Sequence, residues 1–463
     1  MSRPKLFNEF QEVSSKAWKQ QIQFDLKGAD YNENLIWESP EGIKVKPFYH
    51  SDENGGRIDF SLPLGTSWKI TQHIYAKNAT MANAKALEAL RRGADSLLFT
   101  VASEEIKIER LLKDIPLEAT VIHFEFQFLS VQYIQGLFNF IGNKTHRIHL
   151  NIDLIGHLAK SGNWFHNLKK DHEILEEVII QNQANNFNNI LAVDASLYQN
   201  AGANMVQQLA YALSHANEYL NHFTKDATQN AIQGITFKMA VGTNYFFEIA
   251  KLRAMRLLWK TLANEYNLDL ECHILALPSK RNKTLYDYNV NMLRTTTECM
   301  SAILGGADTI CNLPYDALYH KSNEFGERIA RNQLLILKHE SYFDKVSNPA
   351  DGAYYIESLT TQLAEKALDL FKSLEAGGGF LKQLKEHTIQ KKIKESAKKE
   401  QELFNTHKEV LVGTNKYINK EDRMKDDMEI FPFVKTDARK TLLEPIIEKR
   451  LSEALEQKRL KDE

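Results

Sequence analysis

The sequence predicts an α/β protein built around a (β/α)8 barrel, a TIM barrel, with an arm before the barrel and a helical extension after it. Short runs rich in β-branched and aromatic residues recur eight times between residues 68 and 312. Each run is followed by a segment with helical periodicity, and this alternation predicts parallel strands joined by helical crossovers. The chain length of 463 residues accommodates such a barrel with flanking segments. An open doubly wound sheet is the structural alternative.

Residues 1–55 precede the repeating pattern and are predicted to form an N-terminal arm. Within it, the segment 15–26 spaces Trp18, Ile22 and Leu26 four residues apart, so their side chains share one face of a helix. A barrel does not require this segment, and the arm is therefore available for contact with a partner.

Residues 56–345 are predicted to form the barrel. Its strands are expected near residues 68–76, 95–101, 119–126, 147–153, 189–194, 234–240, 269–276 and 307–312. The helices between them are expected near residues 79–92, 130–141, 164–183, 200–222, 244–265, 286–304 and 322–340. In the helix at 244–265 an apolar stripe is predicted to face the strands, while Glu248, Lys251 and Arg256 are expected to face water.

The strand–helix alternation stops after the barrel. Residues 346–420 are predicted to form a helical extension, in which the lysine-rich segment 380–403 is interpreted as one helix with a solvated face. Residues 421–463 are predicted to form a charged helical tail, which either contacts a partner or is loosely held. The helical spacing in this tail comes from Leu443, Ile447, Leu451 and Leu455.

Composition excludes several classes of function. Lys and Arg total 58 against 60 Asp and Glu, so the net charge of −2 provides no basic surface for nucleic acid or an anionic membrane. The three cysteines, Cys272, Cys299 and Cys311, are too widely spaced for a thiolate zinc site and too few for a disulfide scaffold. The first residues lack the apolar core of a signal peptide, and no apolar run approaches 18 residues. We therefore expect a cytoplasmic protein.

In a barrel of this kind, chemistry is carried out where the strands end. The polar residues expected at that rim are Glu125, Asp153, Asp194, Ser196, Lys238 and Asn312. The three carboxylates could serve acid–base work or metal binding, or each could simply pair with Lys238 or a loop residue. Histidines also occur in the predicted strands, namely His73, His123, His149 and His273. A lone strand histidine is more often a satisfied core residue than a metal ligand. The sequence therefore predicts no metal site.

Several stretches resemble the methylmalonyl-CoA mutase family, whose members use adenosylcobalamin to interconvert succinyl-CoA and methylmalonyl-CoA. They run in family order from about residue 10 to 420. The matching stretches are WESPEGIKVKPFY (37–49), WKITQ (68–72), QNAGANMVQQLAYALSHANEYL (199–220), NYFFEIAKLRAMRLLW (244–259), RTTTECMSAILGGAD (294–308), ERIARNQLLIL (327–337), NPADGAYYIESLT (348–360) and VGTNKY (412–417). The resemblance implies a (β/α)8 substrate domain, in agreement with the count of strands.

The resemblance also identifies departures at the active-site positions. The catalytic chain of the family has a Tyr-His pair where this sequence has Ser196 and Leu197, and leucine cannot donate the hydrogen bond that the histidine gives to the thioester carbonyl. A second active-site tyrosine corresponds to Pro63, and an arginine corresponds to Thr66. These replacements imply that this barrel has no catalytic residues of its own.

The C-terminal part agrees with this interpretation. The family's catalytic chain carries a cobalamin-binding domain with a D-x-H-x-x-G motif, and that motif does not occur in this sequence. Too few residues follow the last matching motif for such a domain. The chain thus resembles the small subunit of heterodimeric members of the family. The resemblance implies that it binds no cofactor itself and that its arm wraps a large catalytic subunit, which holds the adenosylcobalamin.

Two other functions remain open. The barrel could be a catalytic acyl-CoA mutase that uses a cobalamin domain supplied in trans, with Lys238 and Glu125 as the polar groups reaching its centre. It could also be a module that binds acyl-CoA without turnover. That possibility depends on whether the axial channel is open or is filled by bulky side chains such as Phe99, Phe124 and Phe126.

Overall fold

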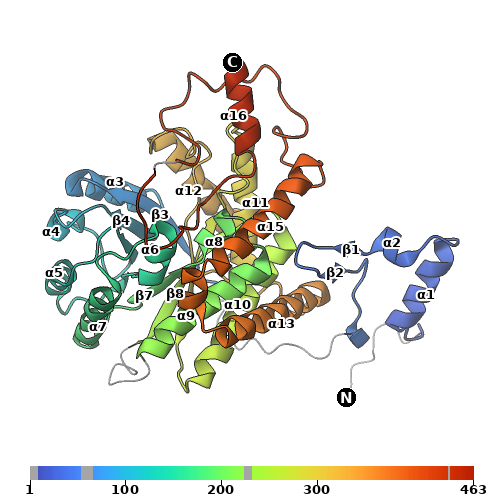
Figure 1. The fold of residues 1–463 in the computed structure, drawn as a ribbon, viewed down its shortest axis with the longest axis horizontal. Helices are drawn as coiled ribbons and strands as arrows, with labels where there is room; N and C mark the ends of the chain where they lie inside the picture. The colour runs from blue at the N-terminus through green and yellow to red at the C-terminus, as the bar shows by residue number, and fades with distance from the viewer. Residues whose placement is uncertain (1–8, 54–65, 224–231, 436–437) are drawn as a thin grey trace.

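Parallel strands curl into a barrel in the computed structural model, which describes residues 9–53, 66–223, 232–435 and 438–463 (Figure 1). In this part of the chain the eight-stranded sheet has the order β6-β5-β4-β3-β10-β9-β8-β7 and parallel pairing throughout. Its strands are β3 (Lys69–Ala76), β4 (Ser96–Val101), β5 (Val121–Phe126), β6 (Arg147–His149), β7 (Leu191–Asp194), β8 (Gly234–Val241), β9 (Glu271–Pro278) and β10 (Thr309–Ile310).

The chain that continues from β6 closes the sheet into a barrel. Ile152 forms a parallel bridge with Leu191, the first residue of β7. The Leu150 N–H donates to the Asn189 carbonyl at 2.8 Å, and the Ala192 N–H donates to the Ile152 carbonyl at 3.0 Å. The strands therefore follow one another in chain order around the barrel, as the sequence predicts, and the doubly wound alternative is excluded.

Helices cover the outside of the barrel, and many begin at a polar cap. The Asn78 side chain accepts from the Met81 N–H and begins the first barrel helix, and Ser130 and Asn323 cap later helices in the same way. The outer layer consists of α3 (Ala79–Arg91), α4 (Ile108–Leu111), α5 (Val131–Ile141), α6 (Leu154–Ser161), α7 (Leu168–Asn185), α8 (Ser196–Asn200), α9 (Met205–Phe223), α10 (Tyr245–Glu265), α11 (Val290–Leu304) and α12 (Glu324–His339).

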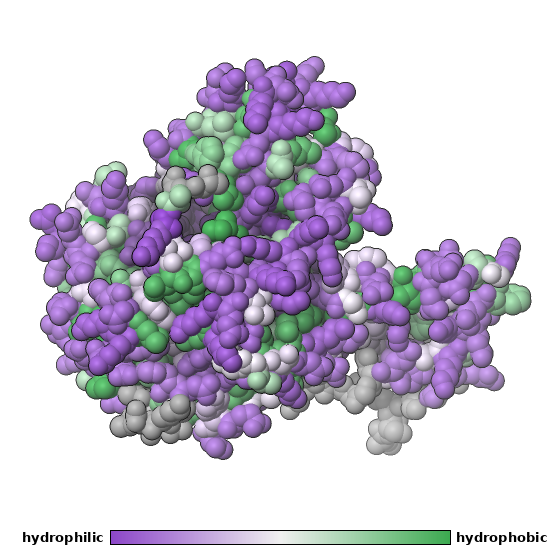
Figure 2. Space-filling view, viewed as in Figure 1, coloured by the Kyte–Doolittle hydropathy of each residue, from purple (hydrophilic) through white to green (hydrophobic). Residues whose placement is uncertain are grey.

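The N-terminal arm extends from one side of the barrel (Figure 1). Its hairpin packs on the body, where Ile43 is fully buried in the main core and the Trp37 ring lies edge-on to Phe247 with the centroids 5.8 Å apart. The Tyr49 ring also contacts the ring of Tyr355 on the body, at 5.1 Å. Figure 2 shows the outer part as a separate, mainly hydrophilic lobe with isolated hydrophobic residues. The elements of the arm are α1 (Ser15–Asp25), α2 (Tyr31–Leu35), β1 (Trp37–Glu38), β2 (Lys44–Val45) and η1 (Ser51–Glu53).

The C-terminal part differs from the sequence prediction in two places. The basic segment forms two helices, α14 (Phe380–Lys385) and α15 (Thr388–Asn405), which are separated at His387, a residue in the left-handed conformation. They follow the long helix α13 (Tyr354–Ala376), which packs against α9 and α10.

The tail is neither a helix throughout nor loosely held. Its helix, α16, begins only at Glu453, and residues 438–452 run as non-helical chain. Leu443 and Leu451 are nonetheless buried, because this non-helical segment packs against the barrel. No helix in the described part of the chain is long and apolar enough to cross a membrane.

Candidate functional site

Three charged side chains meet at the mouth of the barrel, where the strands end. Lys238 on β8 places its Nζ 2.7 Å from Glu125 Oε1 on β5 and 3.3 Å from Asp194 Oδ2 at the end of β7. Residues that are paired across parallel strands point to the same side of the sheet, and Asp194 is registered with Lys238. The cluster therefore points into the barrel, as the sequence predicts for these three residues, and its charges are paired with one another.

The charges in this cluster stabilise one another. Burial alone would favour the neutral amine of Lys238, but the carboxylates of Asp194 and Glu125 outweigh it, so the pKa of Lys238 is raised. Burial would raise the pKa of Asp194, but Lys238 and Lys160 outweigh it, and the pKa of Asp194 falls to about 2. At neutral pH Lys238 is thus a fixed cation, and neither it nor Asp194 is suited to exchange protons with a substrate.

Asp153, the third carboxylate at this rim, serves as a structural anchor. Its Oδ1 accepts from the Gly156 N–H at 2.8 Å and caps α6, and its Oδ2 accepts from the Asp194 N–H at 2.7 Å. The Tyr219 hydroxyl donates to Oδ1 at 2.8 Å. A side chain at Gly156 would have its Cβ 2.1 Å from the carboxylate, so the cap requires glycine there.

The short helix α8 determines which side chains after β7 face the pocket at the mouth. Ser196 donates its hydroxyl to Asp194, and Leu197 is 2% exposed and lines the pocket at the mouth. Tyr198 does not line this pocket. Its hydroxyl lies 2.8 Å from His215 Nδ1, and its ring packs against Phe380 in the outer layer. The tyrosine and histidine nearest to this position in the chain therefore do not take the place of the polar pair that the family's catalytic chain has there.

The pocket at the mouth has a volume of about 130 Å³. Besides the charged cluster, it is lined by His157, whose ring stacks on Phe165 with the centroids 3.6 Å apart. Burial lowers the pKa of His157. The pocket is large enough for a few water molecules or a small group.

Apolar side chains fill the axis of the barrel beneath this pocket. Leu98, Leu275 and Cys311 form a buried cluster inside the strands. Phe99 and Phe124, which the sequence left as candidates to fill the axis, do not lie there. Their neighbours Leu98 and His123 point inward, and both phenylalanines belong to the outer core between strands and helices. Phe126 lies at the mouth and lines the pocket there.

The C-terminal tail crosses the mouth and is bonded to the loops that form it. The Ile446 N–H donates to the Ala159 carbonyl at 2.8 Å, and the Lys449 N–H donates to the Asn200 carbonyl at 3.0 Å. The Asn200 side chain donates to Glu448 at 2.9 Å. The tail thus restricts access to the end of the barrel at which an enzyme of this fold would bind its substrate.

The remaining predicted positions lie elsewhere. Asn312 donates to the Ala330 carbonyl and to Gln333, and so belongs to the contact between barrel and helices. Thr66 lies in an exposed turn before β3, at the opposite end of the barrel from the mouth. Pro63 falls outside the described residues.

The fold and the mouth together define a (β/α)8-barrel protein whose rim holds mutually paired charges and a leucine under a covering tail. The sequence profile of the family described as Methylmalonyl-CoA mutase matches residues 100–461. The chain belongs to this family.

Individual relatives agree. The methylmalonyl-CoA mutase small subunit of Porphyromonas gingivalis is 35% identical over 443 residues, which cover 90% of this chain and 72% of that protein. The small subunit from Streptomyces virginiae is 26% identical over 442 residues, covering 88% and 71%. The methylmalonyl-CoA mutase of Rhizobium meliloti is 29% identical over 468 residues, covering 88% and 64%. This chain therefore spans less than two thirds of the Rhizobium protein.

Proposed function

We propose that this chain is the small, non-catalytic subunit of a heterodimeric adenosylcobalamin-dependent methylmalonyl-CoA mutase, and that it supports assembly and stability of the large subunit. The large subunit performs the interconversion of succinyl-CoA and methylmalonyl-CoA in the cytoplasm. The observation that carries this proposal is Leu197, which lines the mouth pocket where the catalytic chain of the family has a histidine. A leucine side chain cannot donate a hydrogen bond to a thioester carbonyl.

The interior of the barrel supports the same proposal. An acyl-CoA substrate needs space for its acyl group and a donor for the charge that develops on the carbonyl. Here Leu98, Leu275 and Cys311 fill the axis, and Lys238 is already held by Glu125 and Asp194. Withdrawing Lys238 from its two carboxylates to serve a substrate would leave both of them without their counter-ion.

Adenosylcobalamin does not fit the residues at this mouth. A pocket of about 130 Å³ beneath a bonded tail is far too small for a corrin ring with its upper ligand. The histidine that lines it, His157, is stacked on Phe165 and does not belong to a D-x-H-x-x-G sequence. We therefore propose that the cofactor belongs to the partner subunit, and no step of the reaction is assigned to this chain.

The arm supports the role in assembly. In α1 and the chain around it, apolar side chains remain exposed: Val13 is 58%, Trp18 is 44% and Phe24 is 78% exposed. The arm contacts the barrel mainly through its hairpin, and α1 lies at the far end of the arm, away from the barrel (Figure 1). Apolar residues of this size are normally covered in an obligate complex, for which we expect a buried area of more than about 2,000 Å².

Co-expression with the large subunit tests the proposal. We expect the two chains to co-purify at a ratio of one to one, and we expect the large subunit to be less soluble or less active when this chain is omitted. A matched control replaces this chain by its variant lacking residues 1–36, which removes α1 and α2 and keeps the packed hairpin. A soluble monomer with no affinity for the large subunit would contradict the proposal. Turnover by this chain with a separate cobalamin domain would favour the catalytic alternative.

A further inference from the structure

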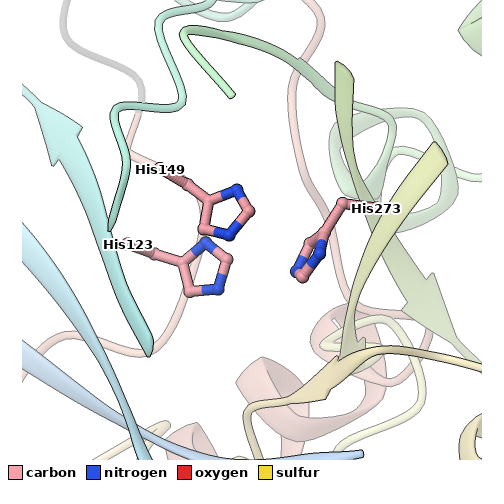
Figure 3. A group of neighbouring side chains, drawn as sticks. All are labelled: His123, His149 and His273. Atoms are coloured by element: carbon pink, nitrogen blue, oxygen red, sulfur yellow. The ribbon is translucent and has the colours of Figure 1, made fainter. Parts of the chain in front are cut away.

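Three histidines gather inside the barrel at some distance from the mouth. His123 lies on β5 and His149 on β6, where they are registered with each other, and His273 lies on β9 across the barrel. Their rings face one another, as Figure 3 shows. The ring centroids of His123 and His149 are 4.6 Å apart, and that of His273 lies 5.2 Å from the first and 4.4 Å from the second.

All three rings are buried, and two of them have a nitrogen without a hydrogen-bond partner in the described part of the chain. The exposed fractions of His123, His149 and His273 are 0%, 4% and 6%. Among the residues that the structure describes, His123 Nε2 and His149 Nδ1 have no hydrogen-bond partner. A buried polar atom without a partner costs about 1–3 kcal/mol, so two such atoms side by side need an explanation.

Neighbouring polar groups can orient two of the rings for metal binding. The Asn151 carboxamide lies 3.2 Å from His123 Nδ1, and a rotation that turns its oxygen to the ring lets it accept the Nδ1 proton. The lone pair of His123 then lies on Nε2, which is the nitrogen without a partner. The Thr309 hydroxyl lies 3.1 Å from His273 Nε2 and can fix that ring in the same manner. Such secondary contacts are typical of metal-binding histidines.

The protonation state suits the same role. Burial lowers the pKa of His123 and His149 well below the usual value, with the neighbouring His273 adding to the effect, and burial also lowers the pKa of His273. All three imidazoles are therefore neutral at pH 7, and a neutral imidazole is the form that coordinates a metal.

We propose that His123, His149 and His273 bind one Zn²⁺ ion inside the barrel. One ligand atom from each residue lies within 4.8 Å of the others. Zinc–nitrogen bonds of about 2.0–2.1 Å place tetrahedral ligands about 3.4 Å apart, so binding draws the rings together by about an ångström. Three imidazoles without a thiolate or carboxylate ligand favour zinc over magnesium or calcium.

The fourth coordination position faces the N-terminal end of the barrel. A pocket of about 230 Å³ opens there, and both His149 and His273 line it. The first residues of several strands form its rim, including Arg147 and Glu271, and the Glu271 carboxylate lies 4.0 Å from His273 Nδ1 as a partial counter-charge. Three protein ligands with one open position form a zinc site that holds a water molecule or a small anion.

This site is independent of the proposed function. None of the three histidines lines the pocket at the mouth, although Asn151, which contacts His123, does. Zinc binding can therefore be present or absent whether or not the chain is a mutase subunit.

Zinc content tests the proposal on the full-length chain, purified with its large subunit where it needs one. After removal of metals with a chelator, we expect titration with Zn²⁺ in competition with a chromophoric chelator to show one tight equivalent per chain. The variants His149→Gln and His273→Gln should each lose that equivalent. The matched control His339→Gln, at an exposed position on α12, should retain it.

Two further measurements report directly on the wild-type chain. Zn²⁺ should raise the melting temperature of the wild-type chain, because it binds the folded state. Co²⁺ in place of zinc should give the strong visible absorption of a tetrahedral site, and this band should be absent in His273→Gln. A wild-type chain without a zinc-dependent melting shift would overturn the proposal, and so would variants that keep the full equivalent.

Discussion

The Lys238 ammonium lies 2.7 Å from Glu125 Oε1, and this contact joins β8 to β5 across the mouth of the barrel. The two side chains are 17% and 27% exposed. Lys238 also neutralises Asp194, so one cation serves two carboxylates. The arrangement stabilises the mouth and leaves none of these three charges free for a substrate.

Replacing Lys238 by methionine tests this structural interpretation. Lys238→Met keeps the length of the side chain but leaves Glu125 and Asp194 without their cation, and we expect the free energy of unfolding to fall by about 1–3 kcal/mol. Mutase turnover of the assembled complex should be unchanged. Urea denaturation and a steady-state assay check the two parts. The double variant Lys238→Met with Glu125→Gln should recover part of the stability, and a fall in kcat at unchanged stability would instead indicate a catalytic lysine.

The C-terminal tail is predicted to be part of the folded body. Glu456 is fully buried, forms an ion pair with Arg450 at 2.6 Å and accepts from the Leu285 N–H at 2.8 Å. Glu456→Ala leaves a buried guanidinium without its counter-charge and should cost about 3–5 kcal/mol. Glu444→Ala removes an exposed ion pair with Lys394 and should cost less than about 1 kcal/mol. Equal effects of the two substitutions would show that the tail is not packed as described.

The arm is predicted to carry affinity for the partner. Val13→Ala and Phe24→Ala together remove apolar area that is largely exposed in the isolated chain, so its melting temperature should change by no more than a few degrees. Binding to the large subunit should weaken at least tenfold, which surface plasmon resonance can measure. Ile180→Ala, at a 54% exposed position on α7, is the matched control and should bind normally. Unchanged affinity in the arm variant would place the interface elsewhere.

Stability should depend on pH through the three barrel histidines. Their pKa values are lowered by burial, so below about pH 6.5 the unfolded chain takes up protons that the folded chain does not. Stability is therefore fully present above pH 6.5 and is lost as the pH falls, by about 1.4 kcal/mol per pH unit for each histidine.

Urea denaturation of the metal-free chain between pH 7 and pH 5 measures this slope. His123→Gln should remove the share of one histidine from it, whereas the exposed His339→Gln should leave it unchanged. A free energy of unfolding that is the same at pH 7 and pH 5 would show that the three rings are not buried in their neutral form.

Local patterns were sufficient to predict most of the barrel. The eight strands lie within a few residues of their predicted positions, because each buried strand has a β-branched or aromatic run. Short elements were missed: α6 and α8 contain only eight and five residues, too few for a helical period to emerge.

Burial of charged residues could not be predicted from one helix. Glu248, Lys251 and Arg256 lie off the apolar stripe of α10 and were expected to face water, yet all three are buried. Lys251 is ion-paired with Glu248, and Arg256 with Asp308, in the layer that α9, α13 and the loops place over this helix. Only the packing of other elements determines which side of such a helix is solvated.

The tail shows the opposite error. Leu443, Ile447 and Leu451 are spaced like a helix face, but the segment lies extended over the barrel mouth, and Ile447 is 49% exposed. Backbone hydrogen bonds to the barrel loops replace those of a helix. Four-residue spacing in a charged segment is too weak a signal to separate these outcomes.

The sequence could predict that the charged residues at the mouth lie close together, but it could not predict the same for the three histidines. Glu125, Asp194 and Lys238 could be placed together because parallel strands end at one rim. His123, His149 and His273 were each interpreted as a lone, satisfied core residue. Their meeting depends on strand register and on facing positions across the barrel, which no single strand records. Matching inward positions between strands was the signal that could have found them.

In the proposed complex, catalysis belongs entirely to the partner subunit. The most direct measurement is mutase turnover, with saturating adenosylcobalamin and succinyl-CoA, by a complex of this wild-type chain and a large subunit inactivated at its own catalytic histidine. We expect this complex to turn over no faster than the inactivated large subunit alone. Faster turnover that is lost when Lys238 is replaced in this chain would show that this chain is itself catalytic.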